Sequence, residues 1–89
     1  MLTWKHPNNN LHICFIDQPE DSPLAGCVFR DIKEKEIYWF WEIRSRGYWG
    51  ISLIKTGGSR KIENSMKACS SCVEKIYGEI LRDKYRIEG

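Results

Sequence analysis

The chain has 89 residues, of which 42% are hydrophobic and 29% are charged. This length and composition predict one small globular domain, exclude a disordered chain, and leave little volume for a deep catalytic cavity. The formal net charge of +2 predicts no partner by itself, although the segment from Arg44 to Ile62 contains five basic residues and no acidic one.

Residues 1–10 contain Pro7 and three Asn, which predict an irregular lead-in. This segment lacks the apolar stretch of a signal peptide, and no apolar run in the chain has the length of a transmembrane helix. We therefore expect a cytoplasmic protein with no membrane association, in which the four Cys are reduced thiols.

Residues 11–56 predict a four-stranded antiparallel meander, with strands at 11–17, 24–32, 37–44 and 48–56. The third strand has the strongest signal, because Ile37, Trp39, Trp41 and Ile43 alternate with more polar residues. That alternation predicts a core face made by these four residues. The opposite face then carries Tyr38, Phe40, Glu42 and Arg44.

Residues 60–85 predict an amphipathic α-helix after Gly57-Gly58, with Ser59 as its N-cap. Six residues recur at helical spacing and form its apolar side: Ile62, Met66, Cys69, Val73, Ile76 and Ile80. Gly78 within the helix indicates close approach to another part of the backbone. The predicted fold is α+β, a single domain in which this helix covers one face of the meander and overhangs its end.

Cys69 and Cys72, at i and i+3 of the helix, are candidates for half of a zinc site, which His12 and Cys14 on the first strand complete. The alternative is that Cys69 is a small hydrophobic residue of the core. No nucleophile, base or phosphate-binding motif accompanies them. We therefore predict a protein that is not an enzyme and has no cofactor.

The face opposite the predicted core is a candidate protein-binding surface, because one helix covers only one side of a sheet. Its expected contact residues are Tyr38, Phe40, Arg44, Arg46 and Tyr48. The alternative is that the first ten residues, with Leu2 and Trp4, fold over this face.

Nucleic acid is the second candidate partner, through Arg44, Arg46, Lys55, Arg60 and Lys61. The run Gly58-Ser59-Arg60-Lys61, at the start of a helix that follows a meander, resembles the double-stranded-RNA-binding domain. The resemblance implies phosphate contacts by the basic pair. The alternative is that the helix begins with two solvated basic residues.

The overall architecture, with a Trp-x-Trp strand at Trp39 and Trp41, a Gly-rich turn and one amphipathic helix, resembles small phage and mobile-element proteins, among them anti-CRISPR proteins and other host-defence inhibitors. That resemblance implies an inhibitor or adaptor that occludes the surface of a protein partner without catalysis. It carries no site residues over to this chain. The overhanging helix end also allows a homodimer.

Overall fold

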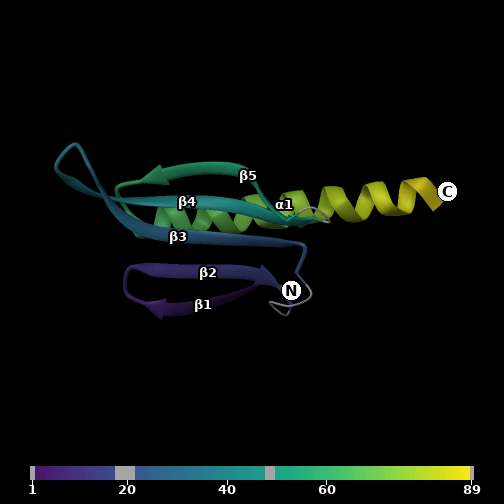
Figure 1. Cartoon of the computed structure of the whole chain (residues 1–89), viewed down its shortest axis with the longest axis horizontal. Coiled ribbons are helices and arrows are strands. Elements are labelled where there is room, and N and C mark those ends of the chain that lie inside the picture. The colour runs from purple at the N-terminus through teal and green to yellow at the C-terminus, as the bar shows by residue number, and fades with distance from the viewer. Residues whose placement is uncertain (1, 18–21, 48–49, 89) are drawn as a thin grey trace.

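The computed structural model describes residues 2–17, 22–47 and 50–88. Five strands precede one helix: β1 (Leu2–Asn8), β2 (Leu11–Ile16), β3 (Leu24–Lys33), β4 (Glu36–Gly47), β5 (Gly50–Ser59) and α1 (Ile62–Glu88). Each strand pairs antiparallel with the next along the chain, and α1 runs along one face of the sheet (Figure 1). The predicted α+β meander with a C-terminal helix is confirmed, but it has five strands, not four.

The additional strand is β1, so the prediction of an irregular segment at residues 1–10 was wrong. β1 pairs with β2 at the sheet edge, and its register shifts between Lys5 and Asn8, around Pro7. An edge strand tolerates Pro because one side of its backbone needs no partner. The side chain of Asn8 accepts a hydrogen bond from the Asn10 backbone N–H at 2.8 Å, so the Asn run forms the tight turn between the two strands.

The hairpin of β3 and β4 turns at Glu34 and Lys35, which have φ angles of 52° and 66°. Positive φ at both central residues suits the twist of a two-residue hairpin. Near this turn Ile32 and Ile37 pair across the strands, and they are 71% and 53% exposed. The expectation that Ile37 belongs to the core was therefore wrong.

The core lies between α1 and the sheet face that α1 covers, called here the covered face. Trp41 and Ile43 of β4 are buried there, as predicted, together with Val28 of β3 and with Cys69 and Val73 of α1. Leu2 and Trp4 of β1 pack against the same core. The first residues of the chain therefore extend the sheet and pack on the covered face, and the alternative that they fold over the opposite face was wrong.

Two strand glycines leave room for side chains that pack on the covered face of the sheet. A Cβ atom on Gly26 would lie 2.5 Å from the Cys14 Sγ and 2.6 Å from the Cys69 Sγ, so this position has no room for a side chain. A Cβ atom on Gly57 would lie 2.5 Å from the indole of Trp41, which covers this part of β5. Gly78 has no neighbour within 4 Å of such an atom, so the close approach predicted there was wrong.

Helix α1 begins two residues later than predicted and ends three residues later. The Ser59 hydroxyl accepts a hydrogen bond from the Lys61 backbone N–H at 3.2 Å. Both residues precede α1, so this bond stabilises the segment between β5 and α1, and Ser59 does not cap α1 as predicted. At the other end α1 extends past the strands (Figure 1), and Ile80 is 40% exposed. The molecule measures 52 × 25 × 22 Å, with a radius of gyration of 14.0 Å. In its described residues, no helix is both long and apolar enough to span a membrane.

Candidate protein-binding face

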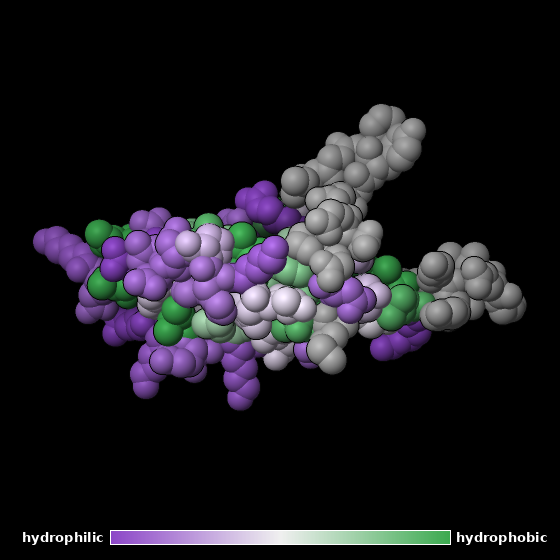
Figure 2. Space-filling view, turned by 90° about the horizontal axis from the view of Figure 1, so that it is seen from below, coloured by the Kyte–Doolittle hydropathy of each residue, from purple (hydrophilic) through white to green (hydrophobic). Residues whose placement is uncertain are grey.

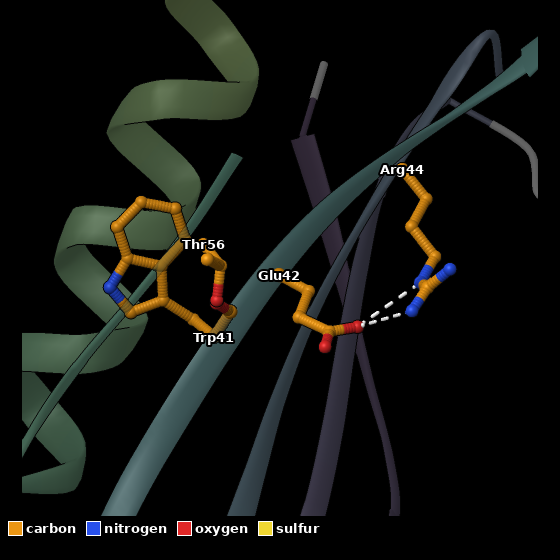
Figure 3. Close-up of polar contacts among 4 residues, drawn as sticks. All are labelled: Trp41, Glu42, Arg44 and Thr56. Carbon is orange, nitrogen blue, oxygen red and sulfur yellow. Dashed lines mark hydrogen bonds and ion pairs between the residues drawn. The ribbon is translucent and has the colours of Figure 1, made fainter. Parts of the chain in front are cut away.

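The sheet face that points away from α1, called here the open face, is set by the alternation of β4. Figure 3 shows the Trp41 indole on the helix side of β4, whereas Glu42 and Arg44 project from the other side. Phe40 and Tyr38 follow the same alternation as Glu42, so they also lie on the open face. Among the described elements, α1 alone lies across the sheet, and it leaves this face uncovered.

Three aromatic side chains, called here the aromatic strip, run along the open face: Phe29, Tyr38 and Phe40. Phe29 and Phe40 are directly opposite each other on β3 and β4, and their rings stack with centroids 5.9 Å apart. The Tyr38 and Phe40 ring centroids are 4.8 Å apart. All three side chains are half-buried. The rings therefore hold one another in place and still present part of their surface to solvent.

The Tyr38 ring also covers a glycine of the next strand, because a Cβ atom on Gly58 would clash with the ring carbons of Tyr38. Gly57 and Gly58 were predicted to end the strand, but both lie within β5. Each accommodates an aromatic ring from β4, one on either face of the sheet. The absence of side chains at Gly57 and Gly58 thus lets the rings of β4 pack directly on the backbone of β5.

Charged side chains border the aromatic strip. The Lys33 ammonium lies 4.9 Å from the centroid of the Tyr38 ring, and Glu36 forms an ion pair with Arg60 at 3.1 Å. At the other end Arg44 donates two hydrogen bonds to Glu42, of 2.8 Å and 3.1 Å (Figure 3). Positively and negatively charged side chains therefore both border the aromatic strip.

A small polar hollow of about 110 Å³ lies beside Tyr38, at the end of the strip nearest the β3–β4 turn. Its lining comes from the β3–β4 hairpin and from the connection that precedes α1: Lys33, Glu34, Glu36, Tyr38 and Arg60. This volume accommodates one side chain of a partner and is smaller than the pockets of about 300 Å³ or more that hold small-molecule ligands.

On the β2 side of the aromatic strip, the open face continues through Ile13, which is half-buried, and Phe15, which is 4% exposed. The Lys5 ammonium lies 5.8 Å from the Phe15 ring centroid. Figure 2, which shows the molecule from the β1 side, has a mostly hydrophilic surface with separate hydrophobic patches. Among the described residues of the open face, the half-buried aromatic side chains are therefore those of β3 and β4.

Of the five residues predicted to contact a protein partner, the structure brings Tyr38, Phe40 and Arg44 together on the open face. Arg46 belongs to β4, but its side chain lies outside the described part of the chain, and Tyr48 lies outside it entirely. Phe29 was not predicted. A turn centred on Glu34-Lys35 sets the register that places Phe29 opposite Phe40. The position of the turn in the sequence therefore predicts this pair.

Of the basic residues predicted for nucleic-acid binding, the four whose side chains the structure describes do not form one surface, and the Arg46 side chain lies outside its described part. Arg44 is on the open face, whereas Lys55 pairs with Ile43 and lies on the covered face. Arg60 and Lys61 lie in the short connection between β5 and α1. Two of these cations, Arg44 and Arg60, have a carboxylate partner, which reduces the positive potential that attracts phosphates.

Three of the four candidate zinc ligands separate into two groups, and the fourth, Cys72, is half-buried and packs against the core. Cys14 and Cys69 are fully buried with their Sγ atoms 4.0 Å apart, whereas the His12 Nδ1 lies 2.7 Å from the Nδ1 of His6. Within the described residues, no group of three His, Cys, Asp or Glu side chains is placed to hold a metal ion. The two thiols instead serve as core residues, which was the alternative for Cys69.

Comparisons of this chain with protein-family models, with curated proteins and with solved structures found no match.

Proposed function

We propose that this protein is a non-enzymatic binding module that holds a protein partner against the aromatic strip on its open face. The observation that carries the proposal is the row of three half-buried rings on a sheet face that no described element covers. Partly exposed Tyr and Phe side chains next to Arg are typical of interface cores. By occluding the partner's surface, such a module acts as an inhibitor or an adaptor.

The rigidity of the strip supports this function. Its rings project from β3 and β4, the two strands that pair over ten consecutive residue positions, and they contact one another before any partner arrives. Little side-chain entropy is then lost when a partner covers them. A partner with an apolar centre and a polar rim of mixed charge matches this surface best.

Nucleic acid fits the same face less well. The described charges around the strip include Glu36 and Glu42 as well as Lys33 and Arg44, so both signs of charge border it. Phosphate binding needs several cations that act together on one surface. A protein partner is therefore our proposal, and nucleic acid is an outcome of the test.

The test compares capture from a cell lysate by the unmodified protein, by a Phe40→Ala variant and by an Ile80→Ala control, whose substitution lies on the exposed part of α1. We expect a partner that the unmodified protein and the control retain, and whose affinity for Phe40→Ala is reduced roughly 30-fold. Circular dichroism first establishes that all three proteins are folded.

Two results would contradict the proposal. One is equal capture by the unmodified protein and by Phe40→Ala, because the strip then takes no part in binding. The other is capture that disappears after nuclease treatment and weakens steeply with salt, which indicates a nucleic acid.

A further inference from the structure

Two thiols meet where α1 crosses the sheet. Cys14 on β2 and Cys69 on α1 are both fully buried, and their Sγ atoms lie 4.0 Å apart. A disulfide has an S–S length of about 2.05 Å, so each sulfur needs to move by about 1 Å for a bond to form. These two cysteines are 55 positions apart in the sequence, so a bond between them would close a long loop.

Gly26 provides the space for this contact. Both sulfur atoms lie over its backbone, since a Cβ atom there would be 2.5 Å and 2.6 Å from them. No side chain of β3 therefore stands between the two thiols. Cys27 follows Gly26 in the strand and points to the open face, so it cannot replace Cys14 in this contact.

The hydrogen bond between the two thiols gives them different roles. When the Cys69 S–H donates to Cys14, it lowers the pKa of the Cys14 thiol. The same hydrogen bond raises the pKa of Cys69, and burial raises it further. The first proton therefore leaves from Cys14, which makes Cys14 the nucleophile of the pair and Cys69 the thiol that reacts second.

We propose that Cys14 and Cys69 are an oxidation site, at which a peroxide converts the pair into a disulfide that ties α1 to β2. The Cys14 thiolate attacks one peroxide oxygen and breaks the O–O bond, leaving a sulfenic acid and a hydroxide that takes up a proton. Cys69 then attacks the Cys14 sulfur and expels its hydroxyl as water. Two thiols and one hydrogen peroxide thus give one disulfide and two waters.

Because both thiols are fully buried, the reaction requires a brief separation of helix and sheet. Once formed, the bond restricts the unfolded chain more than the folded one, since the folded chain already holds the sulfurs in contact. The oxidised protein is therefore expected to be more resistant to unfolding than the reduced one, with the same fold.

The experiment uses a Cys27→Ser, Cys72→Ser variant, which keeps the pair and removes the two competing thiols. After hydrogen peroxide treatment we expect a monomer that has lost two hydrogens and that yields, on non-reducing digestion, one peptide joining residues 14 and 69. The Tm should rise by roughly 10 °C or more and return to its initial value with dithiothreitol. A matched Cys14→Ser, Cys69→Ser variant should show neither change.

The proposal is overturned if peroxide adds oxygen without a cross-link, if only disulfide-linked dimers form, or if the cross-link leaves the Tm unchanged or lower. Non-reducing peptide mapping of the unmodified protein after the same treatment gives an answer that does not depend on any substitution. A cross-link there between Cys69 and Cys72, in place of Cys14 and Cys69, also overturns it.

Discussion

The two faces of the sheet are made by the same strands but stabilise the molecule differently. On the covered face, β4 places Trp41 and Ile43 under the helix, where they are 8% and 0% exposed. On the open face, the same strand places Phe40 and Tyr38, which remain half-buried and stack with other rings of the sheet. One face thus forms the core of the domain, and the other is the face that we propose to bind a partner, so substitutions at neighbouring positions should separate the two roles.

The largest expected effect is that of Trp41→Ala on the covered face. The substitution removes a ring that is buried between the sheet and α1 and that covers Gly57, so it should destabilise the protein by about 4 kcal/mol. That is a large part of the stability of a small domain. Urea denaturation measures the change, and a loss smaller than that of Phe40→Ala would reverse the assignment of the two faces.

Gly26→Ala should have the next largest effect. The new methyl group would lie 2.5–2.6 Å from two buried sulfur atoms, so α1 or β2 has to move, at a cost of about 1–3 kcal/mol. Thermal unfolding measures this cost. If Gly26→Ala is neutral, the contact between helix and sheet is looser than the structure indicates.

Phe40→Ala tests the open face. Because the ring is half-buried and stacks on Phe29 and Tyr38, its removal should cost about 1–2 kcal/mol of stability, at most half the cost at Trp41. Partner affinity should fall roughly 30-fold, which corresponds to about 2 kcal/mol of binding free energy. Denaturation and binding assays on the same preparation measure both effects, and an unfolded variant would place Phe40 in the core.

Gly78→Ala should change stability in the favourable direction. The position is helical and nothing lies within 4 Å of the added methyl group, so the substitution should stabilise the protein by about 1 kcal/mol. It is the matched control for Gly26→Ala, since the same chemical change is made where the space is open. A destabilising effect would mean that α1 contacts something at Gly78 that the described residues do not include.

The smallest effect is expected for Arg44→Ala. Its ion pair with Glu42 is 2.8 Å long, but the Arg44 side chain is 48% exposed, so the pair should contribute at most about 0.5 kcal/mol. Unfolding in low and high salt measures the contribution, which should fall as salt rises. A loss above about 1 kcal/mol would show that Arg44 also supports the sheet through the packing of its alkyl chain.

The sequence predicted much of the covered face, because alternation along residues 37–44 and helical spacing along residues 62–80 are both local signals. It did not predict where the helix begins over the sheet: the first turn of α1 contacts β4 at Trp39, where the Ser65 hydroxyl donates to the Trp39 carbonyl, so Ile37 lies beyond the helix and is exposed whereas Ile43 is buried. Strand β1 was missed because Pro7 favours a loop in most contexts, whereas an edge strand accommodates it. The predicted binding face was incomplete because the pairing of Phe29 with Phe40 depends on the register of the hairpin.

The elongated shape has a consequence for how the assembly state is measured. A compact chain of this length has a radius of gyration of about 12 Å, whereas this one has 14.0 Å and is about twice as long as it is wide. A single copy should therefore tumble end over end more slowly than a sphere of equal mass, and it should leave a sizing column earlier. Light scattering, which reports mass directly, is needed to distinguish one copy from two.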